Sequence, residues 1–504
     1  LEQLPEELLT QILSELDQTS LGRCAQLSRR WRRLATQPRL WRKIRIDGRT
    51  ADAELMERLR DWLGGSVREI SACGLTAEHR LPLLLAASAS LTCLRLRDMD
   101  QPPAQLAVTE AGRSCPGLLE LRLVDCRNGL SDESLRCLLT GCPRLSLLQM
   151  DSRAAACDAV GWSCSQQLLA EQVCRLASLS VRSWSSAAPM LRDLPECPLL
   201  TSFATCGAEL SNLLTPLSRM PELTDLRLRC RNWCRSATDL QLLGGAARLR
   251  CLRIDSRFVD AASVPPLLAR LPQLRSFRLK SSARVFVLDC HACAILRALP
   301  AGLTDLGLSF EHADWSCRAG VGPPAVLPPN LRRLRLEGLP PRADQLRLME
   351  LLASCPGLAF LTLDLCTDDL LPALLSRLPR LHCLRLTDCS RLTHQAWANL
   401  RELQSLGAAT PDLHELRAHR CSRRSLTDEA LADLCASPVA RGLRRLSLSF
   451  DCSQLTAASL ASIASGCPLL TRLVLAGSGF GQADLQAFRL SFEHCVTVTN
   501  HGPL

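Results

Sequence analysis

The sequence of 504 residues is poor in aromatic side chains, which make up 4% of it, and it has no tyrosine. Lysine occurs only at Lys43 and Lys280, so nearly all of the 60 basic residues are arginine. No basic tract is interleaved with aromatic residues, which argues against a surface for stacking nucleic-acid bases. No uninterrupted apolar stretch reaches the roughly 18 residues that a membrane-spanning helix needs. We therefore expect neither nucleic acid nor a membrane among the partners.

The charge and the cysteines give broader expectations. A formal net charge of +10 favours anionic partners without naming one. The 27 cysteines would suggest a disulfide framework in a secreted protein. The first residues, however, show neither the basic start nor the apolar core of a signal peptide. We therefore expect reduced thiols and a protein of the cytoplasm, the nucleus or both.

A six-residue pattern, L-x-x-L-x-L, recurs along most of the chain at intervals of 23 to 32 residues. Such intervals, about 27 residues on average, are typical of leucine-rich repeats. A weaker copy starts at Val67. The fifteen clear copies begin at Leu91, Leu118, Leu145, Leu176, Leu200, Leu223, Leu249, Leu274, Leu303, Leu331, Leu358, Leu381, Leu413, Leu443 and Leu470.

Each copy predicts a short strand. Its three apolar positions are expected to point into a core, while the residues between them face outward on the concave side. A capping residue and a helical segment follow the strand in several copies, with Ser131, Thr393, Thr427 and Thr456 as the expected N-caps. The sequence therefore predicts an α/β fold, a leucine-rich-repeat solenoid of about 15–16 strand-turn-helix repeats.

Several cysteines hold a fixed place in these repeats. Each of them precedes a proline and stands three residues before a first leucine: Cys115, Cys142, Cys197, Cys355 and Cys467. This placement resembles the cysteine-containing subclass of leucine-rich repeats, in which the thiol is a small buried hydrophobe.

Two other cysteine pairs, Cys230 with Cys234 and Cys290 with Cys293, have the close spacing of metal ligands. A structural zinc site needs four ligands, and neither pair has a second pair at a standard spacing. We therefore expect no metal and no cofactor.

The first 46 residues do not follow the repeat. Apolar residues recur there at helical spacing, with Pro5 at the expected start of a helix. The strings Leu4-Pro-Glu-Glu-Leu-Leu9, Ser28-Arg-Arg-Trp-Arg-Arg-Leu34 and Leu40-Trp41 together resemble an F-box. The expected domains are an F-box at 1–46, a connector at 47–66, the repeats at 67–495 and a tail at 496–504.

The resemblance implies a small three-helix motif that docks on a Skp-family adaptor and, through it, on a cullin scaffold. It assigns eight residues to forming or supporting the adaptor-facing surface: Leu4, Pro5, Leu8, Ile12, Leu13, Leu16, Leu21 and Trp31. Trp41 matches the position that wedges the motif onto the next domain. The alternative is a plain helical cap that seals the end of the solenoid, although a cap would not need so much exposed apolar surface.

Motifs of catalysis are missing from the sequence. It has no Gly-rich phosphate loop, no G-x-S-x-G elbow and no H-E-x-x-H motif. No cysteine can be singled out as a thioester-forming nucleophile, because most of them have repeat positions. The F-box family acts by holding a substrate near a conjugating enzyme, which is catalysis by proximity. We therefore expect a non-catalytic subunit.

The outward position between the second and third leucine is arginine far more often than composition predicts. Eight of the fifteen copies have it: Arg95, Arg122, Arg227, Arg253, Arg278, Arg335, Arg385 and Arg417. Flanking positions add basic residues, among them Arg229 and Lys280. The densest basic patch is expected at Arg227, Arg229, Arg253, Arg278 and Lys280.

Two interpretations of this arginine column stay open. It could capture an acidic or phosphorylated segment of a protein substrate, or an anion such as an inositol phosphate, since guanidinium binds carboxylate and phosphate in a bidentate way. Alternatively, each arginine could pair with a neighbouring acid on a solvated face, where such pairs contribute little. On the first interpretation, neutralising Arg253 and Arg278 together removes substrate capture and spares adaptor binding.

The sequence thus predicts the substrate-recognition subunit of a Skp–cullin–F-box ubiquitin ligase, with the substrate on the concave face of the repeats. A second hypothesis is a cullin-independent interaction scaffold with an F-box-like cap. A third, a hormone co-receptor, requires a ligand pocket of which the sequence shows no specific sign.

Overall fold

The structure is a computed structural model. It describes residues 4–49, 57, 59–60, 66–76, 79, 81–99, 101–126, 131–151, 174–182, 197–206, 217, 219–230, 242–256, 261–281, 291–310, 326–338, 345–364, 366–402, 413–421, 426–452, 455–478, 480–492 and 497–501. The chain forms two compact units, Leu1–Arg231 and Asn232–Leu504.

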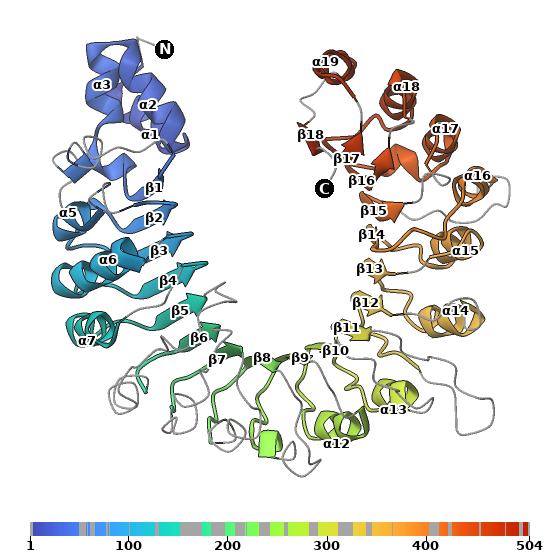
Figure 1. Cartoon of the computed structure of the whole chain (residues 1–504), viewed down its shortest axis with the longest axis horizontal. Coiled ribbons are helices and arrows are strands. Elements are labelled where there is room, and N and C mark those ends of the chain that lie inside the picture. Colours follow the sequence, from blue (N-terminus) through green and yellow to red (C-terminus); the bar gives the residue numbers. More distant parts are fainter. Residues whose placement is uncertain are drawn as a thin grey trace. The chain divides into compact units, whose positions relative to one another are not determined.

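The first unit begins with three short helices and continues as a parallel sheet covered by helices on one face (Figure 1). Each described strand pairs in parallel with the next strand along the chain. The strands are β1 (Lys43–Asp47), β2 (Glu69–Cys73), β3 (Cys93–Arg97), β4 (Glu120–Val124), β5 (Leu147–Asp151), β6 (Ser178–Arg182), β7 (Ser202–Cys206) and β8 (Asp225–Cys230). The helices are α1 (Glu6–Ser14), α2 (Gln18–Leu27), α3 (Arg29–Ala35), η1 (Pro38–Leu40), α5 (Leu81–Ala86), α6 (Gln101–Ser114) and α7 (Asp132–Gly141).

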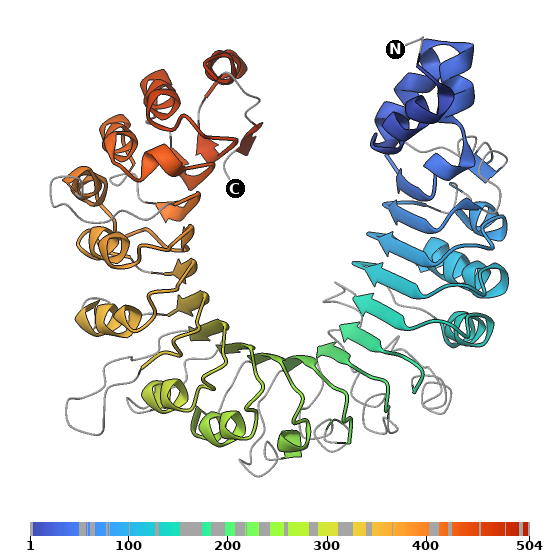
Figure 2. The ribbon, with the colours of Figure 1, turned by 180° about the vertical axis from the view of Figure 1, so that it is seen from behind.

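The second unit repeats the same arrangement, and the view from behind shows its helices again on one face of the strands (Figure 2). Its parallel strands are β9 (Cys251–Ser256), β10 (Ser276–Ser281), β11 (Asp305–Phe310), β12 (Arg333–Glu337), β13 (Phe360–Leu363), β14 (Cys383–Leu386), β15 (Glu415–Cys421), β16 (Arg445–Cys452), β17 (Arg472–Ser478) and β18 (Thr497–His501). Its helices are η4 (Leu242–Gly245), η5 (Ala261–Ser263), α12 (Val264–Ala269), α13 (His291–Arg297), α14 (Gln345–Ala353), α15 (Leu370–Arg377), α16 (His394–Glu402), α17 (Asp428–Ala436), η6 (Ala440–Gly442), α18 (Ala457–Gly466) and α19 (Gln482–Leu490).

The leucines of the repeat form the core in both units. Leu94, Leu121 and Leu148 occupy the same register position in three consecutive strands, and each is fully buried. The residues between the core leucines alternate to the open face of the sheet, as the period of a strand requires. The expected leucine-rich-repeat solenoid is therefore confirmed, and each repeat buries its apolar side chains against its neighbours.

Two strands extend the sheet beyond the repeats expected from leucine spacing. All of β1 except Asp47 lies within the segment assigned to the F-box, and its buried positions are Ile44 and Ile46, with the buried Trp41 two residues before the strand. β18 lies within the segment assigned to the tail, where Val498 and Asn500 stand in register with Leu473 and Leu475. Of the expected connector, only residues 47–49, 57, 59–60 and 66 are among those described.

Buried thiols link successive repeats. The Cys115 Sγ lies 3.4 Å from the backbone oxygen of Ser88, and the Cys142 Sγ lies 3.3 Å from that of Cys115. Burial raises the pKa of Cys115 to about 12 and that of Cys142 to about 11, so both are neutral thiol donors at pH 7. These cysteines are packing residues with a hydrogen bond to the preceding repeat, which agrees with their expected role.

Helix caps also connect the repeats. Ser131, Thr427 and Thr456 each accept a backbone hydrogen bond at the start of a helix, and Thr393 Oγ accepts one from the N–H of Gln395. All four predicted N-caps are confirmed. Two of the capping threonines are held in turn by an aspartate of the preceding repeat: Asp368 holds Thr393 and Asp428 holds Thr456.

The Asp428 carboxylate accepts hydrogen bonds from the backbone N–H of Thr456 at 3.0 Å, from its hydroxyl at 2.6 Å, and from the Ser459 hydroxyl. Burial raises the pKa of Asp428, but the hydrogen bonds from Ser459 and Thr456 outweigh it and leave the pKa below its ordinary value. A carboxylate with a depressed folded-state pKa stabilises the fold above its unfolded pKa and loses that effect as the pH falls through the folded value.

We therefore expect Asp428→Asn to lower the free energy of unfolding by about 1.5–3 kcal/mol at pH 7, the usual range for hydrogen bonds to a charged group. The difference from the wild type should shrink as the pH falls below about 4. Denaturant unfolding at pH 7 and at pH 3 measures both values, with Glu429→Gln on the adjacent exposed residue as the control. An equal loss at both pH values would contradict this account.

Trp41 joins the N-terminal helices to the sheet. It is 7% exposed, and its indole N–H donates to the backbone oxygen of Ala35 at 2.7 Å. The next residue continues the backbone ladder of the sheet, because the oxygen of Arg42 accepts the N–H groups of both Arg68 and Glu69. The helices α1–α3 are therefore attached to the first strand, which is the wedge role implied for Trp41.

Replacing Trp41 by alanine should lower the free energy of unfolding by about 3–5 kcal/mol, as for other large-to-small core substitutions. Trp41→Phe keeps most of the apolar volume and loses the hydrogen bond, so we expect a smaller cost of about 1–2 kcal/mol. Denaturant unfolding followed by circular dichroism gives both values. Unchanged stability of Trp41→Ala would show that the helices are held in another way.

Candidate functional site

Helix α1 carries apolar residues on two faces. Leu9 and Leu13 are buried against the other helices, with exposed fractions of 1% and 0%. Leu8, Ile12 and Leu16 remain exposed, at 47%, 44% and 36%. Leu8 and Ile12 are four residues apart and lie along one face of α1, and Leu16, two residues past the end of α1, continues the same spacing. We call these three residues the α1 stripe.

The other residues assigned to adaptor binding have different environments. Pro5 is exposed, and Leu4 and Trp31 are half-buried. Leu13 and Leu21 are buried, so their role is to support the helices rather than to contact a partner. A further apolar residue, Leu27 at the end of α2, is 69% exposed. In the sequence, Leu27 follows Leu21 and Cys24 at three-residue intervals, as expected for a helix, but it was not among the residues assigned to adaptor binding.

Specific polar contacts hold the three helices together. Asp17 accepts the N–H of Ser20 and Ser28 accepts the N–H of Trp31, which caps α2 and α3. The Arg30 guanidinium donates to the backbone oxygen of Leu4 at 2.8 Å, and Arg33 forms an ion pair with Glu6. The α1 stripe is therefore presented on a fixed support and not on a loose segment.

The second candidate surface is the open face of the strands. In the first unit, Arg95 on β3 stands in register with Arg122 on β4. In the second unit, Arg253 pairs in register with Arg278, and Arg385 with Arg417. The arginine column predicted from the repeats is therefore a spatial ladder within each unit.

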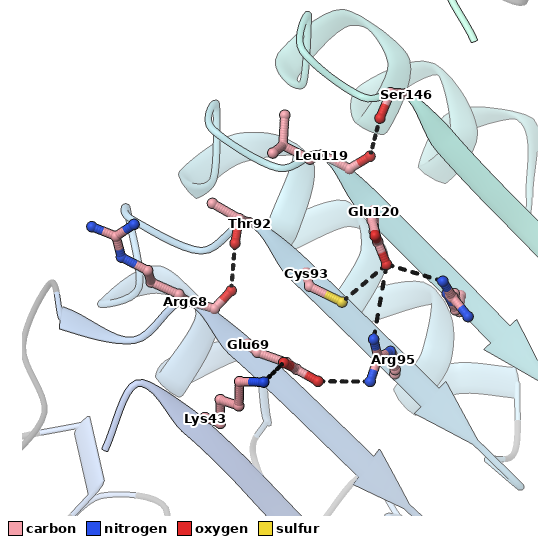
Figure 3. A network of polar contacts seen from close by, with 10 residues as sticks. Lys43, Arg68, Glu69, Thr92, Cys93, Arg95, Leu119, Glu120 and Ser146 are labelled. Carbon is pink, nitrogen blue, oxygen red and sulfur yellow. Dashed lines mark hydrogen bonds and ion pairs between the residues drawn. The ribbon is translucent and has the colours of Figure 1, made fainter. Parts of the chain in front are cut away.

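Acidic residues interleave this ladder. Glu69 lies 2.6 Å from Arg95 and 3.3 Å from Lys43, while Glu120 lies 3.2 Å from Arg122 and 3.9 Å from Arg95 (Figure 3). The Cys93 thiol also donates to Glu120, at 3.6 Å (Figure 3). Lys43, Arg95 and Arg122 are therefore already engaged by carboxylates.

The second unit shows the same pairing. Arg278 donates two hydrogen bonds to Asp305, at 3.2 and 3.0 Å. Glu415 accepts from Arg385 at 3.0 Å and from Arg417 at 2.5 Å. Burial raises the pKa of Glu415, but Arg417 and Arg385 outweigh it and keep the pKa below its ordinary value. This acid is therefore ionised at neutral pH and balances part of the arginine charge.

Among the eight column arginines, seven have an ion pair with an acid of the open face: Arg95, Arg122, Arg227, Arg278, Arg335, Arg385 and Arg417. Arg253 is half-buried, and its Nε has no hydrogen-bond partner among the described residues. The expected dense patch is divided between the two units, since Arg227 and Arg229 lie on β8 while Arg253, Arg278 and Lys280 lie on β9 and β10. The column has the pairing that the second interpretation anticipates, and an anion bound there would compete with these acids.

The described residues contain no group of three or more His, Cys, Asp or Glu side chains placed to hold a metal ion. Cys234 and Cys290, each half of a pair considered above as metal ligands, lie outside the described residues. None of the described helices has the length and apolar character needed to cross a membrane.

Comparison with known proteins gives one family match and several structural likenesses. Among solved structures, the Rad7 and Elc1 complex of yeast aligns with a TM-score of 0.42 and 19% identity, over 59% of this chain and 75% of that one. A leucine-rich-repeat protein of Leptospira interrogans aligns with a TM-score of 0.31 and 13% identity, over 97% of each chain. The TLR13–ssRNA13 complex aligns with a TM-score of 0.41 and 13% identity, over 82% of this chain and 63% of that one.

The family match falls on the N-terminal helices. Residues 1–47 match the family described as F-box-like, a segment that contains α1, α2, α3 and β1. The strand and helix arrangement of the remaining described residues is that of leucine-rich repeats. The chain therefore joins an N-terminal F-box-like domain to a leucine-rich-repeat solenoid.

Proposed function

We propose that this protein is the substrate-recognition subunit of a Skp–cullin–F-box ubiquitin ligase, acting in the cytoplasm, the nucleus or both. The observation that carries the proposal is the α1 stripe, an apolar surface within the segment that matches the F-box-like family. An F-box is a docking module for a Skp-family adaptor, and the adaptor links it to a cullin.

The energetics of the α1 stripe favour a protein partner. Full burial of one leucine or isoleucine contributes about 1.5–3 kcal/mol. Single exposed apolar residues are ordinary on protein surfaces, whereas several in one row mark an interaction site. Two such side chains on α1 and a third just past its end give a partner a preformed apolar anchor.

The repeats would supply the other half of the function. In each unit their open strand face carries arginines paired with acids of the same or a neighbouring strand. Such a face suits recognition of a protein surface by charge complementarity. A substrate held there, or at an adjacent edge, is brought near a conjugating enzyme that other subunits recruit. The contribution of this chain is then positioning, with no chemical step on its own residues.

A cullin-independent interaction scaffold is the second candidate, and one observation favours it. Trp41 packs at the end of the sheet, and the Gln18 side chain accepts the backbone N–H of Arg45 at 2.8 Å, so α1–α3 also cap the first strand. A cap protects the end of a repeat array without any partner. The two candidates differ in whether the α1 stripe is covered by an adaptor.

We expect the full chain to co-purify with a Skp-family adaptor and a cullin. The double substitution Leu8→Ala, Ile12→Ala should weaken adaptor binding about 100-fold or more, because both side chains lose their buried contacts. Binding is measured by titrating the purified adaptor against immobilised chain. Leu490→Ala, which removes a still more exposed leucine on α19, is the control and should bind as the wild type does.

Circular dichroism of the double variant should match the wild type, since Leu8 and Ile12 lie outside the core. Failure of the folded wild-type chain to bind any Skp-family adaptor would refute the ligase proposal and leave the scaffold. Unchanged binding by the double variant would place the adaptor elsewhere.

A further inference from the structure

A groove of about 870 Å³ runs along one edge of the sheet in the second unit. Its lining comes from the turns that enter β11 to β14 and from the residues just before β10 to β14. We call it the edge groove. Its lining residues are Arg275, Gly302, Thr304, Pro329, Asn330, Leu331, Arg332, Arg333, Gly357, Ala359, Phe360, Arg380 and His382.

The charge of the edge groove is of one sign. Four of its residues are arginines with exposed side chains, Arg275, Arg332, Arg333 and Arg380, and the lining includes no aspartate or glutamate. No hydrogen bond or ion pair joins these four guanidinium groups to other described residues; the Arg333 guanidinium lies instead 4.6 Å from the centre of the Phe360 ring. This distinguishes them from the column arginines, seven of which are paired with acids.

The groove also has an open, partly apolar floor. Pro329 and Ala359 contribute to it above the buried Leu331, and Phe360 is 38% exposed. No atom lies within 4 Å of the place that a Cβ would take at Gly302 or Gly357, so there is free space above both glycines. At the far end the His382 ring stacks on His414, with 5.2 Å between the ring centres.

The backbone of this edge is rigid and offers few donors. The oxygen of Arg275 accepts the N–H groups of Thr304 and Asp305, and the oxygen of Arg332 accepts those of Ala359 and Phe360. Because these backbone groups are used within the sheet, recognition at the groove falls to the arginine side chains. Guanidinium groups prefer carboxylate and phosphate, which they bind with two parallel hydrogen bonds.

The size of the groove favours an extended chain over a single small anion. Strands β10 and β14 are four strand spacings apart, roughly 19 Å at the usual separation. That length corresponds to about six residues of extended peptide at ~3.3 Å each. Nucleic acid fits less well, because single strands bind through several stacking aromatic side chains, and the lining has one phenylalanine, which Arg333 already covers.

We propose that the edge groove binds an acidic peptide segment of a protein partner, with carboxylates of that segment on Arg275, Arg332, Arg333 and Arg380. The proposal rests on the proposed function only in regarding this partner as the ubiquitination substrate. Peptide binding is measured without adaptor or cullin, so its failure and the failure of adaptor binding are separate results.

The test is fluorescence anisotropy of a fluorescein-labelled peptide of six Glu-Ser repeats, titrated with the full chain. The same peptide with Gln in place of Glu should show no saturable binding. We expect Arg332→Glu with Arg380→Glu to weaken binding of the Glu-Ser peptide at least tenfold. The matched control is Arg136→Glu with Arg144→Glu, which changes the net charge equally at exposed arginines of the first unit and should stay within twofold of the wild type.

A second variant tests the groove without changing its charge. Gly357→Phe places a side chain in the free space of the groove, so it should also weaken the peptide at least fivefold while leaving the unfolding midpoint unchanged. The column variant Arg253→Ala with Arg278→Ala should bind within twofold of the wild type.

Four results would overturn the proposal. The first is no binding of the Glu-Ser peptide to the wild-type chain, and the second is full binding of that peptide by the Arg332 and Arg380 variant. The third is loss of peptide binding in the column variant alone. The fourth is that a twelve-nucleotide oligothymidylate binds more tightly than the peptide at the same arginines. The third result would assign the acidic segment to the column, and the fourth would make the edge groove a nucleic-acid site.

Discussion

The stacking of leucine side chains between neighbouring strands is the interaction on which the other features of this protein depend. One repeat is too small to bury its own apolar residues, so each repeat is stable only against the next. The parallel register places Leu94, Leu121 and Leu148 at one level and thereby fixes the outward residues between them. The N-terminal helices obey the same constraint, because the buried Trp41, hydrogen-bonded to Ala35 of α3, lies just before the first strand, where Ile44 is a core residue. The N-terminal helices and the first strands are thus parts of one packing scheme.

The same register determines the electrostatics of the open face. Acids recur beside the column arginines, on the same strand or on a neighbouring one, as Glu69 does for Arg95 and Glu415 for Arg385. Such partly exposed pairs contribute little to stability, but they decide what the face can bind. An anion arriving at Arg385 meets a carboxylate already in place, whereas one arriving at Arg332 in the edge groove meets none among the lining residues. The arginine column and the edge groove therefore differ in whether acids lie beside their arginines, more than in the number of arginines.

The regular parts of the fold could be predicted from the sequence because they depend on local pattern. The leucine spacing gives the strands, and the four capping residues from Ser131 to Thr456 give the helix starts. β1 and β18 escape this reasoning because Ile44 and Ile46 in β1, and Val498 and Asn500 in β18, stand in the place of leucine. Only the register with the neighbouring strand identifies them.

The candidate sites were harder to predict because they combine residues from several repeats. The sequence shows that Arg278 faces outward, but its partner Asp305 comes from the next strand, and the pairing requires both side-chain positions. The edge groove is a stronger case, since Arg275, Arg332 and Arg380 come from three different repeats. Each is an ordinary residue beside a first leucine when its own repeat is considered. Their convergence depends on the stacking of the repeats and cannot be seen in any one of them.

Helix α1 has more apolar surface than a simple cap of the sheet needs. A helix that only seals a sheet needs one apolar face, and in α1 that face is supplied by Leu9 and Leu13. Leu8 and Ile12 of the α1 stripe give the same short helix a second apolar face, about 100° around its axis from the first. An exposed face of this kind lowers solubility unless another surface covers it. Leu490 on α19 is more exposed than any residue of the α1 stripe, but it has no apolar row around it along its helix and is an ordinary surface residue. The continuity of the row, and not the exposure of one side chain, is what distinguishes a docking surface from a capping helix.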